Sequence, residues 1–162
     1  EQGLKLLGVG ENGFRAVTNN VRAIDSLEAM KGLKIRVAGC KVLNTAYDLW
    51  GANWTNANWS EVYTGLQTGT YEGQENPFPT ADGASMSEVQ THVTNWTGIY
   101  DCIFFTMNKE LYDSLSPELQ QIVDECGAKA AECHQQRRKF FHLFHPIFLL
   151  VCNMVPNLPF PT

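Results

Sequence analysis

The arginine at position 36 is the residue whose type and neighbours best suit the binding of an anion. Apolar and charged residues alternate from Leu33 to Val37, which predicts a strand whose apolar face excludes Arg36. The residue comes near the carboxyl end of that strand, the edge at which α/β sheets bind ligands. A guanidinium holds a carboxylate by two parallel charge-assisted hydrogen bonds. The alternation alone also fits a solvated arginine, which is the more common case for this residue type.

Three other residues could complete an anion site. Arg15 opens an extended segment after a predicted turn, where a lone arginine is usually solvated. Asn76 carries both a donor and an acceptor, and Pro77 keeps its backbone extended, although asparagine before proline is also a common turn former. Trp59 could pack in the core or present one ring face to a ligand. Residue types alone leave these alternatives open.

Other reactive chemistry finds little support in the sequence. It contains no glycine-rich phosphate loop, nucleophile elbow or catalytic Cys–His signature, so we predict no catalytic residues and no cofactor. No metal site is predicted either, because the cysteine and histidines toward the C-terminal end lack the ligand spacing of functional zinc sites. Those residues are Cys133, His134, His142 and His145.

The segment from residue 58 to residue 77 positions two of the candidate residues. Asn58 and Glu61 are predicted to cap a helix that Gly69 ends. The chain then leaves through the polar run Gln74–Pro77, which we interpret as the mouth of a ligand site rather than a core element. The apolar face of the helix has the i, i+3, i+4, i+7 spacing and consists of Trp59, Val62, Tyr63 and Leu66.

The remaining pattern is that of an α/β domain. Leu4–Val9 is predicted to be a buried strand followed by a turn at residues 10–13, and Ile103–Met107 is predicted to be a second strand. Val42–Trp50 predicts a helix that Gly51 ends, and Ala81–Val93 predicts a weaker helix. A long helix is predicted to begin at Pro117 and to face the protein body with Leu119, Ile122, Val123, Cys126, Ala130 and Cys133.

Length and composition restrict the class of protein. A chain of 162 residues with 44% hydrophobic and 18% charged residues has the composition of a globular domain rather than of a disordered segment. The formal net charge of −5 argues against a nucleic-acid partner, which needs a basic surface. Cys126 and Cys133 belong to an odd set of five cysteines and are predicted to be small buried residues. No signal peptide is predicted at the start of the sequence.

Several motifs, in order along the chain, resemble one protein family. They are Asn12–Arg15, Lys31–Val37, Trp59–Tyr63, Leu66–Gly69, Gly73–Pro77, Glu88–Gln90 and Leu115–Glu118. Together they resemble the solute-binding proteins of TRAP transporters, the tripartite ATP-independent periplasmic systems that import carboxylates, and in particular the dicarboxylate-receptor type. The resemblance extends from Leu4 to Lys139 and stops near Phe140.

The resemblance implies an α/β, periplasmic-binding-protein-like fold. Residues 1–96 are expected to form mainly the second ligand-binding lobe. Residues 97–139 are expected to return toward a first lobe that this sequence lacks, and to end in a long helix that braces both lobes. Residues 140–162 form an apolar tail that lies outside the resemblance.

The resemblance also implies a function and a location. Such a protein is a periplasmic receptor without catalytic activity, metal or cofactor. It binds an organic acid in the cleft between its lobes and delivers it to the membrane subunits of the transporter, without inserting into the membrane itself. The acid is left open. The residues that the family pattern places at the ligand are Arg36, which grips the carboxylate, with Arg15, Asn76 and Trp59.

A second class of function remains open on the sequence. N-glycosylation sequons begin at Asn53, Asn58 and Asn95, and the chain contains four tryptophans. These features also fit a carbohydrate-binding or carbohydrate-active protein that uses tryptophans as sugar platforms. A structural or adhesion glycoprotein is a third possibility.

Overall fold

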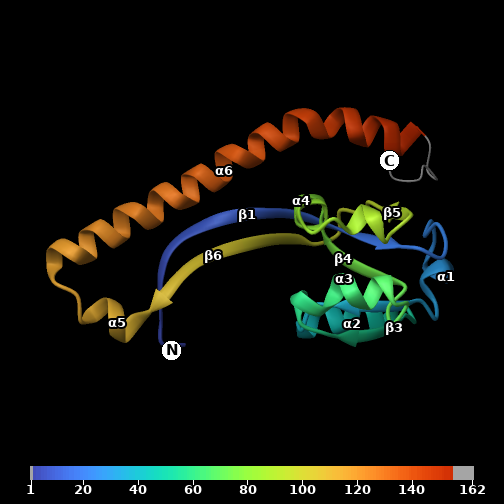
Figure 1. The fold of residues 1–162 in the computed structure, drawn as a ribbon, viewed down its shortest axis with the longest axis horizontal. Helices are drawn as coiled ribbons and strands as arrows, with labels where there is room; N and C mark the ends of the chain where they lie inside the picture. Colours follow the sequence, from blue (N-terminus) through green and yellow to red (C-terminus); the bar gives the residue numbers. More distant parts are fainter. Residues whose placement is uncertain (1, 155–162) are drawn as a thin grey trace. The chain divides into compact units, whose positions relative to one another are not determined.

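The computed structural model describes the backbone of residues 2–154 and the side chains up to residue 135 (Figure 1). The chain divides into two compact units. One unit contains residues 14–100 and carries all four candidate site residues. The other contains residues 2–13 and 101–150.

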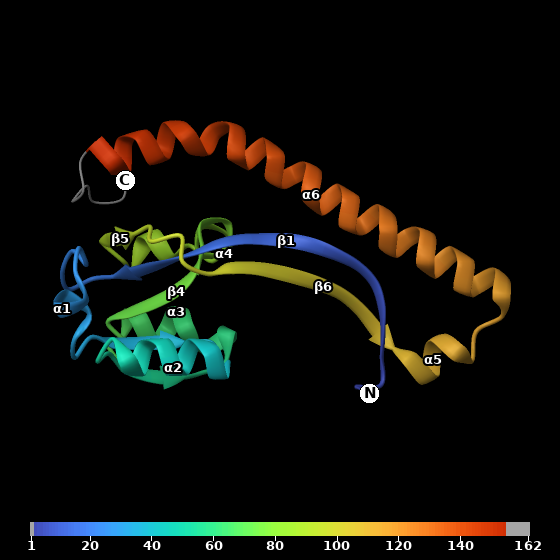
Figure 2. The same cartoon turned by 180° about the vertical axis from the view of Figure 1, so that it is seen from behind.

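A six-stranded mixed sheet has the order β3-β2-β4-β1-β5, with β6 pairing with β1. Strand β2 is parallel to β3 and β4, whereas β1 is antiparallel to β4 and β5. Figures 1 and 2 show β1 and β6 side by side. The strands are β1 (Leu4–Asn19), β2 (Lys34–Val37), β3 (Asn53–Asn56), β4 (Gly73–Pro77), β5 (His92–Thr94) and β6 (Tyr100–Asn108).

Short helices connect the strands of the unit formed by residues 14–100. These are α1 (Leu27–Met30), α2 (Lys41–Leu49), α3 (Trp59–Gln67), α4 (Phe78–Gly83) and the 3-10 turn η1 (Met86–Glu88). Glycines in the left-handed region follow α2 and α3, with φ of +73° at Gly51 and +75° at Gly69, so both predicted helix stops are confirmed.

Two separate apolar clusters hold this unit together. The first joins β1 and β2 to α1 and α2, and its fully buried members include Leu33, Ile35 and Val37, as the alternation predicts. The second joins α3 to α4 and η1 through Val62, Leu66, Ala81 and Met86. Arg36 therefore lies on the strand face opposite a tightly packed core.

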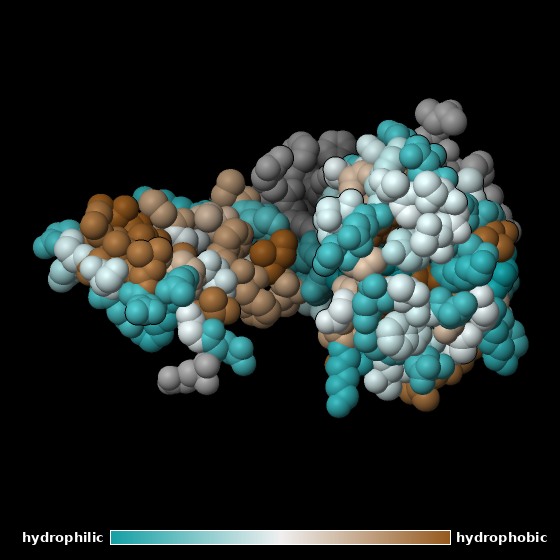
Figure 3. Space-filling view, turned by 60° about the horizontal axis from the view of Figure 1, so that its bottom comes forward, coloured by the Kyte–Doolittle hydropathy of each residue, from teal (hydrophilic) through white to brown (hydrophobic). Residues whose placement is uncertain are grey.

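The other unit pairs β6 with β1 and adds α5 (Lys109–Asp113) and the long helix α6 (Pro117–Met154). Helix α6 and strand β1 contact each other at two glycines, where there is no room for a side chain. A Cβ on Gly127 would lie 2.6 Å from Leu7 Cβ, and a Cβ on Gly8 would lie 2.8 Å from Ala131 Cβ. Apolar side chains gather on the surface of this unit (Figure 3). Its exposed large apolar residues are Leu4, Leu6, Val9, Phe104, Leu111, Leu119 and Ile122.

The predicted turn at residues 10–13 is wrong, since β1 runs through it without interruption. Gly13 adopts φ of +102° inside the strand, a conformation that glycine allows without ending the strand. The prediction that Leu4–Val9 is buried is also wrong, because Leu4, Leu6 and Val9 are exposed.

The predicted inward face of the long helix is wrong as well. Gly127 and Ala131 are buried, whereas Leu119, Ile122, Ala130 and both cysteines of that face, Cys126 and Cys133, are exposed. Small residues let the helix approach the strand closely. The spacing of large apolar residues in the sequence does not indicate that the small-residue face is the buried one. Likewise, Ala81–Val93 is only partly helical: the chain turns at Ser85 and ends in β5, which pairs with β1.

Some predictions lie beyond what the structure describes. The apolar tail at residues 140–162, with His142 and His145, falls outside the residues whose side chains are described. The division at residues 96 and 139 stays a prediction. Among the described residues, no helix has the length and apolar character needed to cross a membrane.

Candidate functional site

The four predicted site residues come together at the carboxyl edge of the parallel strands. Arg36 is the next-to-last residue of β2 and lies opposite Gln74 of β4. Asn76 comes two residues after Gln74 in the same strand, β4. The antiparallel pairing of β1 with β4 sets Arg15 opposite Pro77. Trp59 opens α3 just beyond the end of β3 at the same edge. This is the edge at which α/β sheets bind ligands.

Arg36 is held by a backbone carbonyl and an aromatic ring. Its Nε and Nη2 donate to the Ala57 carbonyl at 3.0 and 2.7 Å, and its guanidinium carbon lies 5.7 Å from the centroid of the Trp59 ring. Only 5% of the residue is exposed. In the part of the chain whose side chains are described, it forms no ion pair with an acidic residue. The alternative that the alternation left open, a solvated arginine, is therefore not what the structure shows: Arg36 is a buried, oriented cation.

Burial lowers the pKa of the Arg36 guanidinium, with the nearby Glu75 acting in the opposite direction. Arginine nevertheless stays protonated in proteins. Burial of a cation without an acidic partner is costly, so an anion bound at this position would offset part of the desolvation cost.

Trp59 is partly buried and partly exposed, and its contact with a ligand stays a prediction. It is 39% exposed at the first position of α3, and it packs over the Arg36 guanidinium in a cation–π arrangement. The predicted capping of this helix is only partly right. Asn58 stands at the N-cap position, but its side chain makes no capping hydrogen bond.

Arg15 is buried and neutralised by a carboxylate. Its Nε forms an ion pair with Glu75 Oε2, and its Nη2 donates to Glu75 Oε1 and to the Glu75 carbonyl, each at 3.0 Å. Only 7% of Arg15 and 1% of Glu75 are exposed. Sequence reasoning did not pair these two residues, since their contact depends on the register of β1 against β4.

Asn76 belongs to a buried chain of polar side chains. Its Oδ1 accepts from Arg15 Nη2 at 3.0 Å, and its Nδ2 donates to Gln74 Oε1 at 2.9 Å. The chain continues from Gln74 Nε2 to Thr18 Oγ1 and from Thr18 to Gln90. The expectation that Gln74–Pro77 is not a core element is wrong, because β4 is an interior strand and every residue in it is buried. Its place at a ligand site stays a prediction. Its polar side chains satisfy one another instead of solvent.

Tyr47 is a further buried polar residue that the sequence analysis missed. It lies on α2 with no exposed surface, and its hydroxyl has no hydrogen-bond partner among the described residues. Burial is the main cause that raises the pKa of the Tyr47 phenol well above its ordinary value, and the negative charge of Glu75 raises it further. The tyrosine therefore stays neutral beside the Arg15–Glu75 pair.

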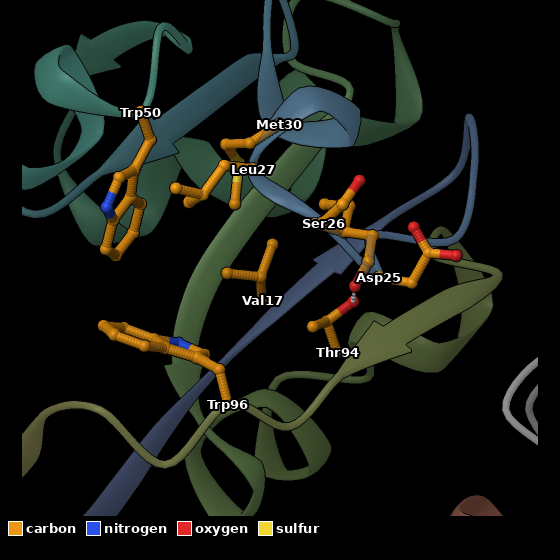
Figure 4. A pocket seen from close by; sticks show the side chains of 9 residues that line it. Val17, Asp25, Ser26, Leu27, Met30, Trp50, Thr94 and Trp96 are labelled. Atoms are coloured by element: carbon orange, nitrogen blue, oxygen red, sulfur yellow. Dashed lines mark hydrogen bonds between the residues drawn. The ribbon is translucent and has the colours of Figure 1, made fainter.

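A pocket of about 300 Å³ opens elsewhere on the same unit (Figure 4). Trp50 and Trp96 form one side of it, with ring centroids 4.9 Å apart, and Asp25, Ser26 and Thr94 lie on the other side. None of the four predicted site residues lines this pocket, and no basic side chain is found among the described residues that line it. Its apolar lining does not suit a carboxylate.

Comparison with known proteins identifies the family. The sequence model of the bacterial extracellular solute-binding proteins, family 7, matches residues 1–139. The chain belongs to this family. It is 38% identical over 129 residues to the 2,3-diketo-L-gulonate-binding periplasmic protein of Escherichia coli, which covers 80% of this chain and 39% of that protein. It is 34% identical over 128 residues to the sialic acid-binding periplasmic protein of Vibrio cholerae, covering 79% and 40%.

Solved structures of family 7 relatives have the same fold. A TRAP periplasmic solute-binding protein from Ralstonia eutropha, with bound (S)-2-acetolactate, matches with a TM-score of 0.78 at 34% identity, covering 82% of this chain and 42% of that one. A relative from Roseobacter denitrificans with bound L-galactonate matches with a TM-score of 0.79 at 29% identity, covering 83% and 44%. This chain spans about 40% of the length of the curated relatives that it matches.

Family membership confirms several expectations. The periplasmic-binding-protein-like α/β fold is confirmed, and family 7 consists of solute-binding proteins rather than enzymes. The named relatives are periplasmic proteins, as expected. The alternative of a carbohydrate-active enzyme loses its support, since family 7 consists of solute-binding proteins.

Proposed function

We propose that this chain forms a ligand-binding lobe of a receptor that captures an organic acid and delivers it to the membrane subunits of a TRAP-type transporter. The observation that carries the proposal is the state of Arg36: buried, oriented by Ala57 and Trp59, and without an ion pair among the described side chains. A carboxylate is the group whose geometry matches the guanidinium.

Three of the four candidate residues then have distinct parts in binding. Arg36 receives the carboxylate, Asn76 offers an amide beside it, and the exposed face of Trp59 packs against the carbon skeleton of the ligand. We propose that the ligand lies in a cleft between this lobe and a second one, as the family resemblance implies. A ligand that touches both lobes favours the closed form by its higher affinity for that form.

The ligands of several relatives support one class of ligand. Their bound or named ligands include 2,3-diketo-L-gulonate, (S)-2-acetolactate and L-galactonate, which are hydroxy or keto acids with one carboxylate each. We therefore expect a small hydroxy or keto acid, in which polar substituents meet Asn76 and neighbouring groups while the carboxylate meets Arg36.

A thermal-shift screen of organic acids tests the proposal. A ligand that binds the folded state raises the melting temperature by mass action. We expect at least one hydroxy or keto acid to raise it in a saturable manner, whereas the matching neutral sugar alcohol leaves it unchanged. If acids and neutral sugars shift the melting temperature alike, the carboxylate has no special role and the proposal is wrong.

A further inference from the structure

The pocket beside Trp50 and Trp96 is separate from the candidate acid site, and its lining residues all belong to one of the two compact units. Its volume of about 300 Å³ is at the lower end of the range of small-molecule sites, about 300–1,000 Å³. Val17, Leu27 and Met30 add apolar side chains to the two rings (Figure 4). Leu27 is 59% exposed, so this apolar wall is open to solvent.

The polar groups on the other side of the pocket already have partners or lie at its rim. Thr94 Oγ1 donates to the Ile24 carbonyl at 3.1 Å, and Ser26 Oγ accepts from the Ala29 N–H at 3.3 Å, where it caps α1. Asp25 is exposed, and its negative charge disfavours a bound anion. The pocket therefore suits an uncharged ligand.

The indole nitrogen of Trp96 is the polar atom of this pocket that lacks a partner. Trp96 Nε1 is buried and makes no hydrogen bond to any described residue. A buried donor without an acceptor costs free energy, and most such donors in proteins are paired. The ring packs edge-on against Trp50 with an interplanar angle of 89°. A small tilt of the Trp96 ring would turn its N–H toward a molecule held in the pocket.

The backbone after Trp96 holds the ring in place at a further cost. Thr97 has φ of +50°, in the left-handed region that β-branched residues rarely adopt. The next residue is Gly98, where a Cβ would overlap the Trp96 ring. Strained backbone persists where its surroundings enforce it, and it is found frequently at ligand sites. The unpaired donor and the strained residue beside it both point to this pocket.

We propose that the pocket binds a small uncharged molecule that is apolar apart from one oxygen acceptor, such as a ketone. Its apolar body packs against the Trp50 ring and the wall that contains Leu27 and Met30, and its oxygen accepts from Trp96 Nε1–H. This inference is independent of the proposed function, because none of the acid-site residues lines the pocket.

Acetophenone is the ligand used in the test, and ethylbenzene is its matched partner without the carbonyl. Each is titrated into the chain labelled with ¹⁵N-tryptophan, in which the four tryptophans give four indole N–H resonances. The Trp96 resonance is the one that is lost in Trp96→Phe. We expect acetophenone to shift it in a saturable manner, while the resonance of Trp59 at the acid site stays in place. No saturable shift of Trp96 in the wild-type chain overturns the inference.

Trp96→Phe keeps an aromatic ring and removes the N–H. Followed at the Trp50 resonance, it should weaken acetophenone binding about threefold to tenfold more than ethylbenzene binding, the range of one net hydrogen bond. Trp54→Phe is the control, because Trp54 packs against the same apolar cluster but does not line the pocket. It should leave both affinities within about twofold. Equal losses for the two ligands in Trp96→Phe would show that the N–H has no part in binding.

Two further measurements exclude other occupants of the pocket. Benzoate has the same ring with a negative charge, so we expect it to leave the Trp96 resonance unshifted. A saturable shift as large as that with acetophenone would contradict an uncharged ligand. The Trp96 resonance should also stay constant when the chain alone is diluted. If it moves, a second copy of the chain covers the pocket and the inference is wrong.

Discussion

Arg36 and Trp59 form one unit at the level of single residues. The ring covers the guanidinium on one side and stays partly exposed on the other, so it both orients the cation and offers an apolar surface. Cation–π contacts of this kind contribute about 0.5–2 kcal/mol, depending on how far the pair is removed from water.

Replacing the ring tests this pairing. We expect Trp59→Leu to weaken binding of the acid found in the screen by about threefold to tenfold, since it removes the cation–π contact but leaves an apolar side chain. Leu49→Ala is the control, because Leu49 is 79% exposed on α2 and lies outside the site. Calorimetric titration of both variants gives the comparison, and equal affinities would show that the ring has no part in the site.

The Arg15–Glu75 pair yields a prediction about stability. Arg15→Met leaves a carboxylate buried without its cation, and we expect this to lower the free energy of unfolding by about 3–5 kcal/mol. Adding Glu75→Gln removes the uncompensated charge and should recover part of that loss. Urea denaturation followed by circular dichroism measures both. A double variant less stable than Arg15→Met alone would contradict the account of this pair.

At the scale of elements, close approach rather than apolar area fixes where α6 meets β1. Gly127 and Gly8 let the helix and strand approach so closely that a Cβ at either position would overlap its neighbour. Ordinarily alanine stabilises a helix relative to glycine by about 1 kcal/mol. At Gly127 the added Cβ would lie 2.6 Å from Leu7 Cβ. Rotation of the Leu7 side chain does not move its Cβ, so it cannot relieve this steric clash.

We therefore expect Gly127→Ala to destabilise the chain by about 1–3 kcal/mol, the usual cost of overpacking. Gly83→Ala is the matched control, because Gly83 also lies in a helix and a Cβ there meets nothing within 4 Å. That variant should be neutral or slightly stabilising. Thermal unfolding of the two proteins decides the matter, and equal melting temperatures would mean that helix and strand are not in tight contact.

The elements around the site could largely be predicted from the sequence, whereas their burial could not. Alternation located β2 and the side that Arg36 occupies, and glycines located the ends of α2 and α3. The polar composition of Gln74–Pro77 indicated an exposed segment, yet β4 lies inside the sheet. Its burial depends on Arg15 and Thr18 of β1, which are more than fifty residues away in the chain and supply the hydrogen-bond partners.

At the scale of the whole molecule, the chain spans about 40% of its relatives' length. If the ligand is enclosed between two lobes, one lobe alone contacts it on one side only. We therefore expect the isolated chain to bind organic acids more weakly than micromolar, and its extension to the full length of a family 7 protein to tighten binding. Calorimetry on the two proteins makes the comparison. Micromolar binding by the chain alone would mean that this lobe is sufficient.

The most direct test of the central claim is the affinity of the full-length protein for its acid with and without the Arg36 guanidinium. Truncating one partner of a buried charge pair costs about 2–5 kcal/mol. Arg36→Ala should therefore weaken binding at least about tenfold in calorimetric titration, since a decade in affinity is about 1.4 kcal/mol. Lys34→Ala, which removes an exposed cation from the same strand, should leave the affinity within about twofold. Unchanged affinity in Arg36→Ala would contradict the account, because the carboxylate would then be held elsewhere.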